Sequence, residues 1–238
     1  MKLGILNGIS PEASGINWNG TPVDTYIRFF QSVDPPFDYV GYELTQGQFP
    51  DSPDECDAYV ITGSLYGVYD TDEWIATLMQ FIRDRYQAGT KLIGICFGHQ
   101  ILAHALGGHA EKSEKGWGFG LKTFDIIEPK AWMTPGPDHC SLYFVHQDQV
   151  IRLPPEAELL GGNPFCPNAF FTIDNRVLGI QGHPEFSESI MRDLLALRKE
   201  RLGPQVYEMA AQSLDSGTPD NQLLAQWMVN FITANPNS

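Results

Sequence analysis

One cysteine of the chain has neighbours that could make it a nucleophile. Residues 94–100 read GICFGHQ, with Cys96 between two glycines. The run follows an apolar stretch typical of a buried strand and opens a segment typical of a helix. Gly94 and Gly98 would permit a tight turn between the two, because a β-carbon at either would crowd the neighbouring chain. The pattern predicts a nucleophile elbow, in which the N–H groups and dipole of the helix start favour the thiolate. The alternative is a buried structural cysteine.

A histidine and a glutamate could complete this site. His183 follows a second apolar run, residues 177–181, so its side chain can project from the same sheet edge as Cys96. Pro184 favours extended backbone at His183, and residues two apart in an extended segment face the same side. Glu185 would therefore lie beside His183, orient the imidazole and stabilise the imidazolium. The residues predict a triad of Cys96, His183 and Glu185; the alternative is a structural histidine at a strand end.

Acyl transfer would also need N–H donors for an oxyanion. One is the backbone N–H of Phe97, directly after the cysteine. Residues 61–67, ITGSLYG, end another predicted strand, so the backbone N–H groups of Gly63 and Ser64 could converge on the same place. An ordinary strand-ending turn is the alternative. A Gly-rich run at residues 116–120 lacks the lysine and the helix of a phosphate loop, and indicates a turn or at most a substrate wall.

A parallel sheet would bring these segments together. Hydrophobic patterning predicts strands at 3–6, 38–44, 58–62 and 91–95, and helices at 23–32, 72–88 and 98–106. This alternation predicts an α/β fold, a doubly wound and mostly parallel sheet with helices on both faces. Later alternating runs, at 121–127, 142–145, 158–160 and 169–173, predict a small antiparallel addition, and residues 177–181 should return to the central sheet. Helices are expected at 188–201, 205–213 and 221–232.

Composition excludes several classes of protein. The 238 residues contain 15 Lys plus Arg and 29 Asp plus Glu, a net charge of −14, which argues against a nucleic acid partner. No apolar run is long enough for a membrane helix, and the first residues turn polar too early for a signal peptide. We therefore expect a cytoplasmic protein whose four cysteines are reduced. They form no C-x-x-C pair, so a zinc knuckle is not expected.

At these motifs the chain resembles the class I glutamine amidotransferases, a family with a Cys–His–Glu triad. Residues 94–100 fit the family's nucleophile motif, and residues 182–185, GHPE, fit its His–Glu motif. Residues 62–64 fall at its Gly-Gly-Pro oxyanion strand, although Ser64 and Leu65 replace the second glycine and the proline. Residues 145–150, VHQDQV, fall at the segment that contacts bound glutamine. The chain is most similar in sequence pattern to the amidotransferase domain of GMP synthetase and to the related γ-glutamyl peptidases.

The resemblance covers roughly residues 1–190 and implies a flavodoxin-like fold. Because the nucleophile and its base are far apart in sequence yet must meet, we expect one domain over residues 1–238. Its catalytic core would occupy about 1–190, and C-terminal helices would occupy about 188–234. The segment after Glu185 does not resemble an ATP-binding synthetase domain, and the chain has no phosphate loop, so no acceptor-activating module is expected.

The same resemblance implies an activity. Cys96 would attack the γ-carboxamide of glutamine, and His183 would protonate the departing ammonia before water hydrolyses the thioester. Gln100, His146 and Gln147 would line the glutamine pocket, and neither a metal nor a cofactor would be needed. The ammonia would pass to a separate synthase, if there is one. The alternatives are a γ-glutamyl peptidase or hydrolase with the same triad, and a non-catalytic binding domain.

Overall fold

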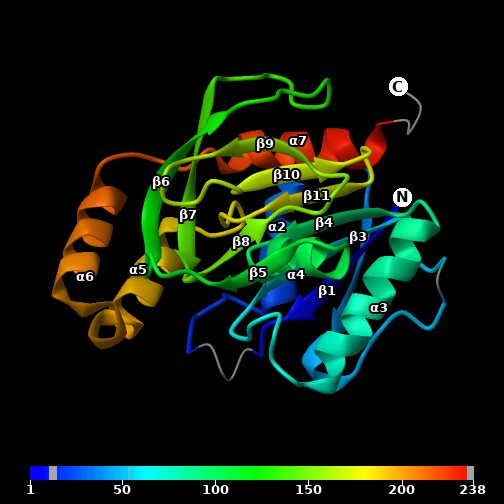
Figure 1. Cartoon of the computed structure of the whole chain (residues 1–238), viewed down its shortest axis with the longest axis horizontal. Helices are drawn as coiled ribbons and strands as arrows, with labels where there is room; N and C mark the ends of the chain where they lie inside the picture. Colours follow the sequence, from blue (N-terminus) through cyan, green and yellow to red (C-terminus); the bar gives the residue numbers. More distant parts are fainter. Residues whose placement is uncertain (11–14, 53, 235–238) are drawn as a thin grey trace.

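The computed structural model describes residues 1–10, 15–52 and 54–234. A nine-stranded sheet crosses the molecule (Figure 1). Its strands are β1 (Lys2–Gly8), β2 (Asp38–Glu43), β3 (Ala58–Ser64), β4 (Lys91–Ile95), β6 (Gly118–Ile126), β7 (His139–His146), β9 (Glu158–Gly162), β10 (Phe170–Ile173) and β11 (Val177–Ile180). They lie in the order β2-β1-β3-β4-β11-β10-β9-β6-β7. A separate antiparallel pair joins β5 (His109–Lys112) to β8 (Asp148–Arg152).

The sheet has a parallel and an antiparallel half. The strands β2, β1, β3, β4 and β11 are parallel, and β11 pairs directly with β4, with Val177 opposite Leu92. This pairing confirms that residues 177–181 return to the central sheet. The strands β10, β9, β6 and β7 continue it in antiparallel fashion, so the antiparallel part is larger than the sequence indicated. The fold is α/β with a mostly parallel central sheet, as predicted.

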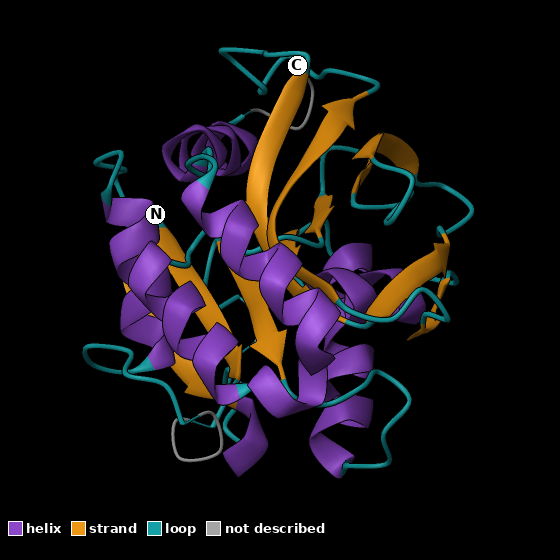
Figure 2. Cartoon of the chain, turned by 90° about the vertical axis from the view of Figure 1, so that its left-hand side faces the viewer, coloured by secondary structure: helices purple, strands orange, loops and turns teal. Residues whose placement is uncertain are grey.

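Helices cover both faces of the sheet (Figures 1 and 2). The helices are α2 (Pro22–Gln31), α3 (Glu73–Gln87), α4 (Phe97–Ala105), α5 (Glu188–Leu197), α6 (Lys199–Asp215) and α7 (Asn221–Thr233), and a short 3-10 helix covers Leu44–Gln46. The helices α2 and α7 pack on one face, and α3 and α4 pack on the other. The helices α5 and α6 pack beside β6 and β7. Thr21 and Asp24 form a capping box that fixes the start of α2.

Alternating side chains of the strands supply the two cores. In β3, Val60 packs with the α2 and α7 side, whereas its neighbours Tyr59 and Ile61 pack with α3 and α4. Both faces of a central parallel strand are covered, so such strands are apolar throughout instead of alternating with polar residues. The burial pattern of β4, buried at all of its residues, follows the same rule. Because β3, β4 and β11 are parallel, their carboxyl ends lie together at one edge of the sheet.

The C-terminal helices break at a different place from the expected one. A helix was expected over residues 188–201, but α5 ends at Leu197 and α6 begins at Lys199. A kink follows at Gly203, whose φ is 73°, directly before Pro204. Proline disfavours helical backbone in the residue before it, so the Gly-Pro pair marks the kink correctly. The first break has no such signal, and it places Arg198 at a corner between two helices.

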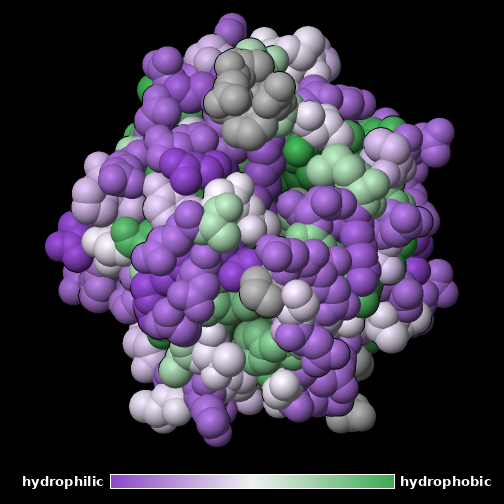
Figure 3. All heavy atoms as spheres, turned by 90° about the vertical axis from the view of Figure 1, so that its right-hand side faces the viewer, coloured by the Kyte–Doolittle hydropathy of each residue, from purple (hydrophilic) through white to green (hydrophobic). Residues whose placement is uncertain are grey.

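Figure 3 shows one face of the molecule as mostly hydrophilic, with hydrophobic side chains gathered in small areas. Among the helices of the described ranges, none has both the length and the apolar character needed to cross a bilayer.

Candidate active site

Cys96 occupies a strained turn between β4 and α4. Its backbone has φ 55° and ψ −103°, a region that residues with a side chain rarely adopt. A β-carbon at Gly94 would overlap the backbone of Gly98, and one at Gly98 would overlap the carbonyl group of Ile61. The two glycines therefore permit the close contact between this turn and β3, as the sequence predicted. The thiol lies at the start of α4 and is 6% exposed.

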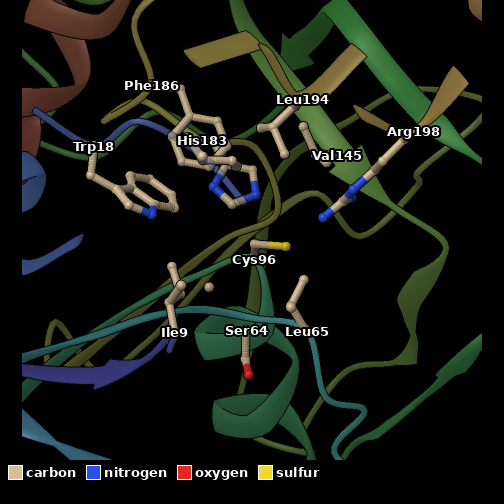
Figure 4. A pocket seen from close by; sticks show the side chains of 12 residues that line it. Ile9, Trp18, Ser64, Leu65, Cys96, Val145, His183, Phe186, Leu194 and Arg198 are labelled. Carbon is tan, nitrogen blue, oxygen red and sulfur yellow. The ribbon is translucent and has the colours of Figure 1, made fainter. Parts of the chain in front are cut away.

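His183 and Glu185 lie at the end of the adjacent strand, β11. The backbone N–H of His183 donates to the carbonyl of Tyr143 at 2.7 Å, which fixes the segment beyond the strand. The Nδ1–H of His183 donates to Glu185 Oε1, also at 2.7 Å, and both side chains are buried. Because β4 and β11 are neighbours, the imidazole lies next to Cys96 (Figure 4). The structure brings the three predicted triad residues together.

The electrostatics of this group favour a protonated imidazole. Burial disfavours the imidazolium, but the charges of Glu185 and Cys96, together with hydrogen bonds to both, outweigh burial and raise the pKa of His183 to about 10. Nδ1 is held by Glu185, so Nε2 is the nitrogen that remains for Cys96 or a substrate. The arrangement can therefore hold a proton on Nε2, next to the Cys96 thiol.

A tyrosine from α2 connects the glutamate to the end of β3. The Tyr26 hydroxyl donates to Glu185 Oε1 at 2.9 Å and accepts the backbone N–H of Gly63 at 3.0 Å. Burial, followed by the charge of Glu185, raises the pKa of Tyr26 well above its ordinary value, so the hydroxyl keeps its proton. Tyr26 lies within the helix predicted at residues 23–32, and its residue type gave no sign of this contact.

This contact changes the expectation for Gly63. Its N–H was expected among the oxyanion donors, but it is engaged by Tyr26. Successive residues of a strand point to opposite sides, so at most one of two adjacent N–H groups would face a bound substrate. Ser64 and Phe97 are the donors that remain. The Ser64 hydroxyl points away from the cavity and donates to the carbonyl of Gly8 at 2.8 Å, so only its backbone faces the site (Figure 4). Phe97 begins α4, where N–H groups lack helical acceptors.

Phe186 covers the imidazole on its other face. The two rings are parallel, with an interplanar angle of 6° and a centroid separation of 4.1 Å. Such stacking restricts the rotation of the His183 ring and keeps water from that face. Phe186 directly follows the His–Glu motif, but phenylalanine is so common in cores that its type alone did not indicate a role in the site.

Two cavities meet at Cys96. The larger has about 780 Å³ of open space and mostly polar walls, whereas the smaller has about 400 Å³ and mostly apolar walls. Five residues line both: Ser64, Leu65, Cys96, Val145 and Arg198. The larger cavity contains all three residues expected in a glutamine pocket, namely Gln100, His146 and Gln147. Within the described ranges, no group of three or more His, Cys, Asp or Glu side chains is placed to hold a metal ion.

The pocket residues also support one another. Gln100 Nε2 donates to the carbonyl of Asp148 at 2.8 Å and to Gln181 Oε1 at 3.2 Å. The Nδ1–H of His146 donates to the same carbonyl at 2.9 Å, and burial lowers the pKa of His146 to about 3, so the ring is neutral. The carbonyl of Asp148 thus holds both side chains in place. The other ring nitrogen of His146, Nε2, is buried next to Gly118 and has no hydrogen-bond partner among the described residues.

Arg198 is the main feature of the site that sequence reasoning missed. It lies at the break between α5 and α6, and its guanidinium points toward Cys96 (Figure 4). The same group lies over the ring of Trp117, at 5.6 Å from its centroid, and Arg201 lies over that ring at 5.3 Å. Burial lowers the pKa of Arg198, and in the described part of the chain no carboxylate pairs with it. The sequence placed it inside a continuous helix, beyond the recognisable motifs.

The chain is similar in sequence to known proteins. Residues 22–198 match the sequence profile described as Glutamine amidotransferase class-I. Gamma-glutamyl peptidase 3 of Arabidopsis thaliana is 28% identical over 201 residues, which cover 80% of this chain and 81% of the peptidase. The glutamine-hydrolyzing GMP synthase of Aeropyrum pernix is 35% identical over 132 residues, which cover 52% of this chain and 26% of the synthase.

The fold has solved counterparts as well. A glutamine amidotransferase from Thermotoga maritima superposes with a TM-score of 0.75 and 19% identity, over 98% of both chains. At this identity the likeness shows the fold alone, while the sequence profile extends over well more than half of the chain. The chain belongs to the class I glutamine amidotransferase family.

Proposed function

We propose that the chain hydrolyses the amide bond between the γ-carboxyl group of a glutamyl residue and an amine, through a thioester on Cys96. Glutamine, whose amine is ammonia, is the smallest substrate of this class. The observation that carries the proposal is the position of Cys96 on a strained turn, next to a buried His183–Glu185 pair and open to two cavities.

In the first step, the Cys96 thiolate attacks the γ-carbonyl carbon. The carbonyl oxygen gains negative charge, and the backbone N–H groups of Phe97 and Ser64 are the donors that would stabilise it. The Nε2–H of the His183 imidazolium then gives its proton to the amide nitrogen, and the C–N bond breaks. The amine leaves, and a γ-glutamyl thioester remains on Cys96.

In the second step, water replaces the amine. Neutral His183 takes a proton from the water at Nε2, and the water oxygen attacks the thioester carbon. The C–S bond breaks, glutamate is released, and the thiolate and imidazolium are restored. Glu185 accepts a hydrogen bond from Nδ1–H throughout, which stabilises the imidazolium that both steps need.

The larger cavity supports a substrate with the polar end of glutamate. Its walls include the polar residues Gln100, His146 and Gln147, and Arg198 supplies a cation without a carboxylate partner in the described residues. A guanidinium of this kind is well suited to a substrate carboxylate. The GMP synthase relative supports a further possibility for the product, namely that ammonia released from glutamine passes to a separate synthase.

Glutamate release tests the proposal. The full chain is incubated with L-glutamine, with γ-glutamyl dipeptides and, as controls, with L-asparagine and the α-linked dipeptides of the same composition. We expect glutamate from the γ-linked compounds and no turnover of the controls. The absence of glutamate from every γ-linked compound, in a preparation whose Cys96 is intact, would overturn the proposal.

A further inference from the structure

The two cavities differ in chemistry, and that difference points to a class of substrate. We propose that the smaller cavity binds the leaving group, and that the preferred substrates are γ-glutamyl amides whose amine carries an apolar substituent. This inference rests on the proposed function and makes it more specific. Release of ammonia from glutamine would then be a secondary activity of the same site.

The position of the general acid assigns the leaving group to one side. The departing nitrogen must receive its proton from His183 Nε2, because Nδ1 is held by Glu185. His183 lines the smaller cavity, together with Gly63. Phe97, the donor that directly follows the nucleophile, lines the larger one. With the γ-carbonyl over Cys96, the glutamyl chain would therefore extend into the larger cavity, and the amine would point into the smaller.

The walls of the smaller cavity are predominantly apolar. They include the side chains of Ile9, Trp18, Leu65, Val145, Phe186 and Leu194. Five of these six belong to the hydrophobic cluster beneath α5 and α6, and Leu65 adds a sixth apolar side chain at the mouth. The six residues come from segments far apart in the sequence and lie around Cys96 (Figure 4). Arg198 closes the side nearest the larger cavity.

Such walls do not match ammonia. Ammonia is small and strongly hydrated, and it gains nothing from contact with leucine or phenylalanine side chains. An apolar substituent on the amine would displace water from these walls, which is favourable in proportion to the apolar area covered. Leu65 is 53% exposed, so the cavity has an open apolar lip along which a larger substituent could extend to solvent.

Competition between γ-glutamyl dipeptides tests this assignment. We would measure kcat/KM for γ-glutamyl-glycine, γ-glutamyl-alanine, γ-glutamyl-valine and γ-glutamyl-leucine, with L-glutamine alongside. All four dipeptides carry the same terminal carboxylate, so any contact of that group with Arg198 cancels in their ratios. Burial of one methylene corresponds to about a fourfold gain. We expect γ-glutamyl-leucine to exceed γ-glutamyl-glycine by about tenfold or more, and to exceed glutamine.

A pair of variants on α5 locates the effect. Leu194 lines the cavity and is 3% exposed, whereas Leu197 lies on the same helix, 57% exposed and away from the cavity. In Leu194→Asn, the ratio of kcat/KM for the leucyl over the glycyl dipeptide should fall roughly tenfold, because the new side chain is polar. In Leu197→Asn the ratio should stay as in the unchanged chain. The ratio is independent of the fraction of active enzyme, and thermal unfolding reports whether each variant is folded.

The outcomes separate this inference from the proposed function. Turnover of glutamine or γ-glutamyl-glycine at rates equal to or above that of γ-glutamyl-leucine would overturn the apolar leaving-group site and leave γ-glutamyl hydrolysis standing. An unchanged ratio in Leu194→Asn would overturn it as well. If Leu194→Asn does not fold, Leu65→Ser at the exposed lip replaces it, with the same expected direction. Turnover of none of the γ-linked compounds would overturn both.

Discussion

Replacing Glu185 by glutamine should lower the pKa of His183 and so weaken the stabilisation that the imidazolium gives to a thiolate at Cys96. In the native chain Glu185 is the first of the groups that raise the pKa of His183 above the ordinary 6.5, to about 10, against the opposing effect of burial. Glutamine has nearly the same shape but no charge, so the largest of the effects that raise the pKa is lost, and the pKa of His183 should fall toward its ordinary value. At pH 7 the imidazole would be mostly neutral and would no longer stabilise a thiolate at Cys96.

The magnitude follows from the ordinary chemistry of a thiol. A cysteine without a cationic neighbour has a pKa of about 8.5, so about 3% of it is ionised at pH 7. Alkylation requires the thiolate, so iodoacetamide should modify Cys96 more slowly at pH 7 in Glu185→Gln, by at most about thirtyfold, the ratio between a fully ionised and an ordinary thiol. Most of the rate should return above pH 9. For γ-glutamyl hydrolysis, kcat/KM should fall by about 10²- to 10⁴-fold, because the imidazolium is also needed in both steps.

The assay is the rate of Cys96 alkylation between pH 6 and pH 10, measured by mass spectrometry of the cysteine-containing peptide. Glu188→Gln is a matched control, because this glutamate lies three residues further along, is 57% exposed and pairs with Arg192 on the surface. Its pH profile should equal that of the unchanged chain. A Glu185→Gln profile that coincides with the native one, in a folded protein, would refute the role given to Glu185.

The remaining predictions concern the nucleophile, its supports and the response to pH. Cys96→Ala should abolish γ-glutamyl hydrolysis while leaving the fold intact by circular dichroism; retained turnover would mean another nucleophile. Tyr26→Phe removes a hydrogen bond to a carboxylate and leaves the Gly63 N–H without its acceptor, so the free energy of unfolding should drop by about 2–4 kcal/mol in urea titrations. It should also lower kcat, and an unchanged stability would contradict the contact. Gly98→Ala should lower the free energy of unfolding by about 2–4 kcal/mol in urea titrations, since the added carbon overlaps a backbone carbonyl. An unchanged free energy of unfolding would show that the turn can relax. An unfolded cysteine and histidine have both lost their protons above about pH 8.5, whereas the folded chain keeps the His183 proton up to about pH 10, so the unfolding free energy should decrease as the pH rises between these two values. Glu185→Gln should flatten that dependence, and a native stability that rises over this range would contradict the sign.

Local patterns in the sequence were sufficient to predict that Cys96, His183 and Glu185 lie together. The strand–turn–helix around Cys96 and the extended His-Pro-Glu segment both depend on neighbours in the chain. Two apolar runs gave strands whose carboxyl ends meet at one sheet edge, and β4 and β11 are indeed adjacent. A motif whose residues are close together in sequence can be recognised from a single sequence.

The supports of the triad could not be read in this way. Tyr26 contacts Glu185 across 159 positions of sequence, and nothing about a tyrosine on an apolar helix face distinguishes core packing from a hydrogen bond to a carboxylate. Arg198 enters the site because α5 and α6 break at a residue without a Gly or Pro signal. The engagement of Gly63 by Tyr26 likewise depends on tertiary contact alone. Long-range partners of this kind need the folded chain.

The cysteines are the most direct test of the whole account. All four are free and buried in the structure, and burial raises the pKa of Cys166 to about 12, which makes that thiol inert at neutral pH. A chloroketone analogue of glutamine should distinguish the nucleophile from the others. After treatment and digestion, mass spectrometry should find the adduct on Cys96 alone, with glutamine slowing its formation and Cys96→Ala preventing it. An adduct on Cys56, Cys140 or Cys166 in place of Cys96, or full hydrolytic activity without modification of Cys96, would contradict the account.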